Sequence, residues 1–120
     1  MKKIKLILLF AVSLLSVSAH SETGYQSGTI EYVRTTDKSQ EAWAPPIFWF
    51  TLNGVTSAGN CPAWNGNVLF VADSEQAYSM VLAAYMSGKE VSVRFDDSHK
   101  TGTNFCIPIN ISLGNPPPLF

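Results

Sequence analysis

The stretch DSEQAYSMVLAAYMSGKEVSVRF at residues 73–95 decides the fold, because a helical pattern in it passes directly into a strand pattern. Asp73 is a favourable N-cap residue, and Gln76 follows three residues later. In this capping-box spacing each side chain satisfies a free N–H group of the first turn. Gly88 supplies a left-handed stop at the other end. The pattern predicts a helix from Asp73 to Ser87.

The predicted helix is apolar on almost every side, since Ser79 alone is polar between residues 77 and 86. A surface helix normally carries one apolar stripe, and a chain of this length has no deep interior. We expect one side to pack on a sheet and the other on neighbouring subunits. The residues assigned to this oligomer helix are Tyr78, Val81, Leu82, Tyr85 and Met86. Alternatively, Tyr78 and Met86 are simply exposed or covered by loops.

Two strands are expected after the helix, at residues 90–95 and 105–113, where apolar and polar residues alternate. Pro108 predicts that the second of these lies at a sheet edge or begins irregularly. Asn115 and the three prolines after it form a tail that cannot extend a sheet.

Three strands are expected before the helix, at residues 28–35, 47–52 and 68–71. In the first, Ile30, Tyr32 and Arg34 alternate with residues of a second face. The second is a nearly continuous apolar run, typical of a strand covered on both faces, so Trp49 is expected in the core. The polar segment 20–27 resembles an arm, and the stretch after the Asn53-Gly54 turn signal is expected to be a loop up to residue 66.

The predicted order is strand, strand, strand, helix, strand, strand. This is the order of the OB-fold, a partly open five-stranded barrel that binds oligosaccharides or oligonucleotides. We therefore expect a mainly β protein with one helix and an OB-fold-like barrel, although a different small α+β sandwich would give the same order.

The first residues form a targeting segment. Lys2, Lys3 and Lys5 precede an apolar run from Leu6 to Val17, which ends in the small-x-small pattern Val17-Ser18-Ala19. This is typical of a secretory signal peptide, and the run is shorter than the 18 to 20 or so apolar residues of a membrane anchor. We predict a signal peptide at residues 1–19, one OB-fold-like domain at 20–115 and a Pro-rich tail at 116–120. A cut one or two residues later would fit nearly as well.

Composition limits the function classes. The 120 residues hold 8 basic and 9 acidic side chains, and removal of the leader leaves five basic residues, a net charge of −4. This balance lacks the basic patch that nucleic-acid binding needs. No phosphate loop, nucleophile elbow or metal-ligand constellation is present in the sequence, and we expect neither an enzyme nor a cofactor. Glycoside hydrolysis needs two carboxylates in a cleft, whereas Asp96 and Asp97 are adjacent on an expected turn.

The two cysteines, Cys61 and Cys106, are expected to form a disulfide in the periplasm or outside the cell. Their spacing is not that of a redox or metal motif. A catalytic thiol is the weaker alternative, because His20 and His99 are poorly placed for a stable Cys/His couple.

The segment from Tyr78 to Phe95, an apolar helix running through Tyr85 and Ser87-Gly88 into a Val-x-Val strand, resembles the B subunits of subtilase cytotoxin and of the pertussis-like and typhoid toxins. Ser27-Gly28 resembles the start of that family. The resemblance implies five OB-fold subunits in a ring around a central helix bundle, binding of host glycans, and an enzymatic A subunit as partner.

The same resemblance implies a glycan site. The family uses a serine before the first strand, which falls on Ser27, and a tyrosine after the helix, which falls on Phe95, where the hydroxyl is missing. The toxin subunits also hold more cysteines than the two found here. Trp43 and Trp64, in expected loops, are further candidates, because aromatic faces with a few polar groups commonly bind sugars. Core or loop packing is the alternative for both tryptophans.

The expected function is therefore a secreted or periplasmic, non-enzymatic, glycan-binding subunit that forms a homo-oligomer, with no membrane span in the mature form. The alternative is a small periplasmic interaction or inhibitor domain of the same fold without a glycan role.

Overall fold

The computed structural model describes residues 21–37 and 43–114, so the predicted leader at 1–19 and the tail at 116–120 lie outside the described residues. The described part is mainly β with one helix. Its elements are β1 (Thr23–Thr35), β2 (Phe48–Leu52), β3 (Ala63–Trp64), β4 (Asn67–Ala72), α1 (Glu75–Ser87), β5 (Glu90–Asp96) and β6 (Asn110–Leu113).

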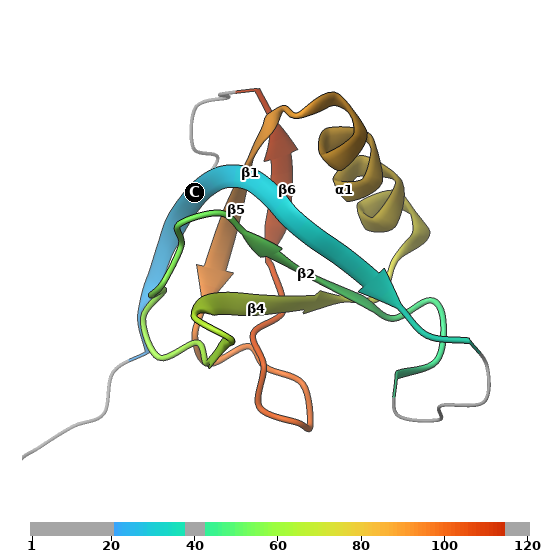
Figure 1. The fold of residues 1–120 in the computed structure, drawn as a ribbon. Coiled ribbons are helices and arrows are strands. Elements are labelled where there is room, and N and C mark those ends of the chain that lie inside the picture. The colour runs from blue at the N-terminus through green and yellow to red at the C-terminus, as the bar shows by residue number, and fades with distance from the viewer. Residues whose placement is uncertain (1–20, 38–42, 115–120) are drawn as a thin grey trace, which may run out of the picture.

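The strands form one open sheet in the order β3-β4-β2-β1-β5-β6, with antiparallel neighbours throughout. In Figure 1, β1 arches across the molecule, and it pairs with β5 along its first half and with β2 along its second half. An isolated parallel bridge joins Phe70 of β4 to Cys106, which precedes β6. The expectation of a five-stranded barrel is wrong in two respects, because the described residues form six strands and their sheet is not closed.

Two local features explain the difference. β3 and β4 form a small hairpin around Asn65 and Gly66, whose positive φ values of 55° and 99° suit a tight two-residue turn. The last strand begins at Asn110 and not at Phe105. Pro108 has no N–H group to donate to a ladder. Residues 105–109 are therefore not part of β6, and they pair with β4 only through the isolated bridge at Cys106.

The first strand is longer than expected, because it begins at Thr23 and so includes most of the predicted polar arm. Its register shifts between Ile30 and Tyr32, as a β-bulge does when it adds one residue to a strand. Ile30 and Val33 therefore both contact the core, although they are three residues apart. The expectation that Ile30 shares a face with Tyr32 and Arg34 is wrong for this reason.

The helix begins one residue after its N-cap, which is Ser74 and not Asp73. Ser74 has an extended backbone, and its Oγ accepts the N–H of Ala77 at 3.0 Å. Gly88, with φ of 69°, ends the helix as predicted. None of the helices described in the structure is long and apolar enough to cross a membrane.

The core lies between α1 and the inner face of the sheet. Its largest fully buried side chains are Phe48, Phe50, Phe70, Leu52, Val68, Val81, Val91 and Val93. Trp49 is half-buried and lies outside this cluster, because successive residues of β2 point to opposite faces. The predicted disulfide is confirmed: Cys61 and Cys106 are bonded, with 5.5 Å between their Cα atoms, and both are buried.

Candidate functional site

The outer face of β1 and β5 carries a group of hydroxyl side chains. Ser27 lies opposite Ser92, which in turn lies opposite Ser112 of β6. The Oγ atoms of Ser27 and Ser92 are 2.8 Å apart and form an exposed hydrogen bond. Because side chains alternate across a strand, these hydroxyls point away from the core. They offer donors and acceptors to a ligand in solution.

Tyr25 and Arg94 extend this surface by one register pair. They face each other across β1 and β5, and the Arg94 guanidinium carbon is 6.0 Å from the centre of the Tyr25 ring. The Tyr25 side chain is 41% exposed. We call Tyr25, Ser27, Ser92 and Arg94 the hydroxyl patch. It combines an aromatic ring, three hydroxyl groups and a cation on a solvent-facing sheet.

Phe95 lies on the opposite side of the sheet from this patch. It is 4% exposed and belongs to the core cluster. Its partner in β1 is Gly24, where an added Cβ would lie 3.1 Å from the ring. The structure therefore does not bring Phe95 together with Ser27, and Phe95 is a core residue here and not an exposed ligand contact.

Sequence reasoning missed three members of the hydroxyl patch. Tyr25, Ser92 and Arg94 become neighbours of Ser27 once β1 starts at Thr23. The signal is the alternation of Thr23, Tyr25 and Ser27 with Gly24, Gln26 and Gly28. This pattern has no aliphatic residue on either face, so hydrophobic periodicity does not identify it as a strand.

Trp43 and Trp64 lie in a separate aromatic row, and Trp64 belongs to strand β3 and not to the expected loop. Trp43 packs edge-on against Trp49, with 4.8 Å between ring centres, and its ring is 6.3 Å from that of Phe105. Trp64 continues the row at 6.4 Å from Phe105 and is 54% exposed. We call Trp49, Trp43, Phe105 and Trp64 the aromatic row. Trp43 and Trp64 thus both lie beside Phe105, and neither pairs with Ser27.

The residues assigned to the oligomer helix divide between two sides of α1. Val81 is fully buried in the core, and the Tyr78 ring packs edge-on against Phe48 at 5.2 Å. Leu82, Tyr85 and Met86 are 36%, 48% and 77% exposed. These three residues form the exposed helix face. Within the described residues, the helix is therefore apolar on a solvent-facing side as well as on the core side.

The adjacent carboxylates of Asp96 and Asp97 have different partners. Asp97 accepts the backbone N–H groups of Glu22 and Asn60, which lower its pKa from the ordinary value. The Ser98 hydroxyl, and then the Ser98 N–H, lower the pKa of Asp96. Both groups are therefore ionised at neutral pH, and neither is tuned to donate a proton in glycoside hydrolysis.

A third carboxylate, Glu31, lies on the outer side of the bulged part of β1. Its Oε1 accepts the Thr51 hydroxyl at 2.7 Å and the Asn67 amide at 2.9 Å, and these bonds lower its pKa. Among the residues that the structure describes, no three His, Cys, Asp or Glu side chains gather as a metal site would require.

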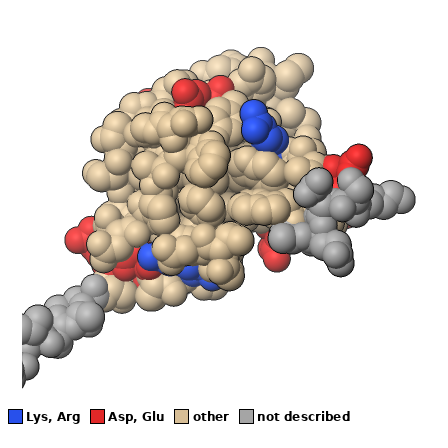
Figure 2. Space-filling view, turned by 60° about the horizontal axis from the view of Figure 1, so that its bottom comes forward, with Lys and Arg blue, Asp and Glu red and all other residues tan. Residues whose placement is uncertain are grey.

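Charged groups are sparse on the face drawn in Figure 2, where Lys, Arg, Asp and Glu form small separate groups on a mostly uncharged surface. Comparisons with known protein families, with curated proteins and with solved structures returned no match for this chain.

Proposed function

We propose that this chain is an exported, non-enzymatic binding subunit that recognises a glycan at the hydroxyl patch and assembles into a homo-oligomer through α1. The observation that carries the proposal is the exposed pair of hydroxyls on Ser27 and Ser92, flanked by the Tyr25 ring and the Arg94 guanidinium. A sugar ring offers hydroxyls to such groups and a C–H face to an aromatic side chain.

The strand pairing supports a relation to OB-fold binding subunits. β1 pairs with both β2 and β5, α1 lies between β4 and β5 in the chain, and the Phe70–Cys106 bridge runs parallel. An OB barrel has these same pairings when the β3 hairpin is counted as an extension of β4. In this proposal the fold is an opened OB-like barrel, and an enzymatic A subunit is a candidate partner.

The exposed helix face supports self-assembly. Leu82, Tyr85 and Met86 are spaced three and four residues apart, so they lie on one side of α1. Contiguous exposed apolar groups on a small protein commonly mark an interaction surface. A second copy presents the same side, as closed symmetric assemblies do. The ring implied by the toxin resemblance would use this face at its centre.

A glycan array of the exported protein tests the ligand class. Ser27→Ala and Ser92→Ala should each weaken binding to the best glycan about tenfold, the equivalent of one lost hydrogen bond of roughly 1.4 kcal/mol. Thr103→Ala, which removes an exposed hydroxyl from a loop outside the patch and α1, is the matched control and should leave binding unchanged. No binding across a broad sialylated and non-sialylated panel would refute the glycan role. Unchanged binding by both patch variants would refute the site.

Light scattering tests the assembly separately. Met86→Glu should convert the oligomer to a monomer, because it places a charge in the proposed helix contact. Thr103→Glu, an exposed loop residue, adds the same charge elsewhere and should leave the oligomer intact. A wild-type protein that is a clean monomer at all accessible concentrations would refute the assembly and leave the glycan proposal standing.

The aromatic row favours a second candidate, a protein-interaction or inhibitor domain without a glycan role. Trp64 is 54% exposed at the end of this row, and exposed tryptophans often anchor protein interfaces. Loss of binding to a protein partner in Trp64→Ala, together with a silent glycan array, would decide for this candidate.

A further inference from the structure

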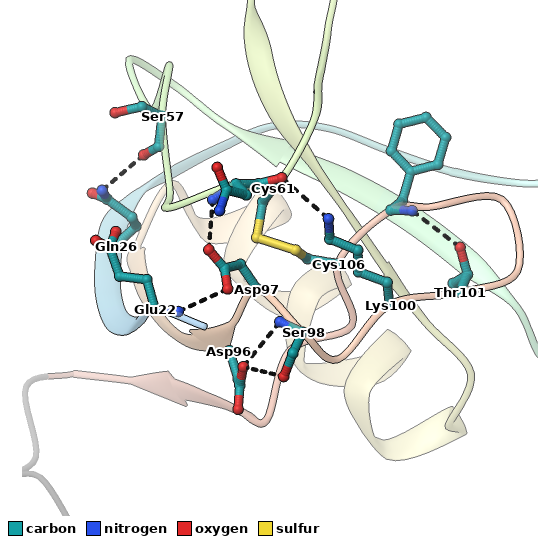
Figure 3. The surroundings of a disulfide bond; sticks show 12 residues. Glu22, Gln26, Ser57, Cys61, Asp96, Asp97, Ser98, Lys100, Thr101 and Cys106 are labelled. Atoms are coloured by element: carbon teal, nitrogen blue, oxygen red, sulfur yellow. Dashed lines mark hydrogen bonds between the residues drawn. A yellow bond between two sulfur atoms is a disulfide. The ribbon is translucent and has the colours of Figure 1, made fainter. Parts of the chain in front are cut away.

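Asp97, at the end of β5, is a buried carboxylate held from two distant parts of the chain. It is 5% exposed. Its Oδ1 accepts the backbone N–H of Glu22 at 2.8 Å, and its Oδ2 accepts that of Asn60 at 2.7 Å (Figure 3). A Cβ added to Gly59 would lie 2.6 Å from Oδ2. The loop around Gly59 is therefore closed tightly over a carboxylate and leaves no room for a larger residue.

Glu22 is fixed by both of its main-chain groups. Its nitrogen donates to the Asp97 carboxylate, and its carbonyl oxygen accepts the Asp97 N–H at 2.9 Å. The chain is thus anchored at this residue, directly before β1 begins at Thr23.

Buried carboxylates in proteins are generally paired with a cation. The charge of Lys100 lowers the Asp97 pKa, but the Lys100 ammonium donates its hydrogen bond to the Asn60 carbonyl, at 3.3 Å. The nitrogen that touches Asp97 Oδ1 is that of Glu22. It is a neutral amide as long as residue 21 is attached.

The sequence before Glu22 allows that attachment to be cut. Ala19-His20-Ser21 has the small-x-small pattern of a signal-peptidase site, as does Val17-Ser18-Ala19. The leader pattern alone does not choose between the two positions. The nitrogen that a cut after Ser21 would free, that of Glu22, is the one that contacts the Asp97 carboxylate.

We propose that the leader is removed between Ser21 and Glu22, and that the new α-ammonium of Glu22 forms a buried ion pair with Asp97. Hydrolysis of this peptide bond consumes one water: the Ser21 carboxylate leaves with the leader, and the amine stays on Glu22. An α-amino group has an ordinary pKa of about 8 and is charged at neutral pH. A charge-assisted bond then replaces a neutral one, so processing itself completes the folded structure.

The site of cleavage is read directly from the exported product. The full chain, expressed with its own leader in a bacterial host, should give a mature protein whose amino-terminal sequence is Glu-Thr-Gly and whose intact mass starts at Glu22. A product that begins at His20 would overturn the proposal.

The ion pair is tested by extending the amino terminus. A glycine inserted between Ser21 and Glu22 keeps the small residue before the cut and gives a product in which the Glu22 nitrogen is again an amide. Its melting temperature should be several degrees lower than that of the native product. Asp97→Asn should remove this difference, whereas Asp96→Asn, which alters the neighbouring carboxylate bonded to Ser98, should preserve it. An unchanged melting temperature in the extended protein would overturn the proposal.

The pH dependence gives a second test if Asp97→Asn does not fold. A carboxylate partner raises the pKa of the α-ammonium, so its stabilisation is complete below pH ~8 and is lost as pH rises through the folded value. The difference between the native and extended products should shrink over that range. The native and extended products share the other charged groups near Asp97, which are Lys100, Asp96 and the Glu22 carboxylate. Their effect on stability is therefore the same in both products and drops out of the difference. A difference that does not change with pH would overturn the ion pair.

Discussion

Removing the disulfide should lower the free energy of unfolding by about 4 kcal/mol, a large part of the total for a domain of this size. The magnitude follows from the 45-residue separation of Cys61 and Cys106, since a cross-link restricts the unfolded chain in proportion to the logarithm of the loop it closes. Cys61→Ala/Cys106→Ala is the direct perturbation.

The folded state should survive this change. The Cys106 carbonyl accepts the Val71 N–H at 3.0 Å, and the backbone of Cys106 is bridged to Phe70. These contacts keep the segment beside β4 without the covalent bond. We therefore expect the loss to arise from the unfolded state, with the fold and the surface chemistry unchanged.

Urea unfolding followed by tryptophan fluorescence measures the effect in three samples: oxidised protein, protein reduced with dithiothreitol, and the double alanine variant. The reduced sample is the matched control, because it keeps both sulfur atoms in place. It should lose about 4 kcal/mol and show a larger m-value, as an unfolded chain without the cross-link exposes more surface. A loss below ~1 kcal/mol with an unchanged m-value would refute the chain-entropy reasoning. A variant much less stable than the reduced sample would assign the effect to packing of the fully buried Cys106.

Three further predictions concern local features. Ser74→Ala should cost about 1 kcal/mol in thermal or urea unfolding by removing the helix cap, whereas Asp73→Ala should cost much less; equal costs would contradict the assignment of the cap. Gly59→Ala should destabilise by more than the ~1 kcal/mol of a left-handed alanine, because its Cβ meets the Asp97 carboxylate, whereas Gly54→Ala, with φ of 78° and open space, carries the conformational cost alone. The pKa of Asp97 is lowered in the folded state, so the stabilisation that this carboxylate provides is present above the ordinary value of 3.8 and is lost as pH falls below it. Between about pH 5 and pH 2 the free energy of unfolding of Asp97→Asn should therefore fall less than that of the wild type.

The sequence predicts the elements that have strong local signals. The apolar run at 47–52, the turn at Asn53-Gly54 and the Gly88 stop all correspond to observed boundaries, because each depends on neighbouring residues alone. The choice between Asp73 and Ser74 as N-cap could not be made this way. Both residue types are good caps, and in the structure it is the Ser74 Oγ that accepts the Ala77 N–H.

The candidate site was harder to predict because it depends on pairing between distant strands. Residues 23–29 have little hydrophobic signal, and they become a strand only through the ladder with β5. The prediction for Phe95 failed for a related reason. Its place depends on which face of β5 meets the core, and Gly24 opposite it leaves the space that the ring fills.

The register shift between Ile30 and Tyr32 has a consequence for which positions tolerate substitution. It divides one strand into two stretches whose inward positions are set independently. Substitutions between residues 23 and 29 can change the outward chemistry without altering which residues of the β2-paired stretch reach the core. Outward side chains of the first stretch can therefore be replaced without changing the residues that the second stretch contributes to the core.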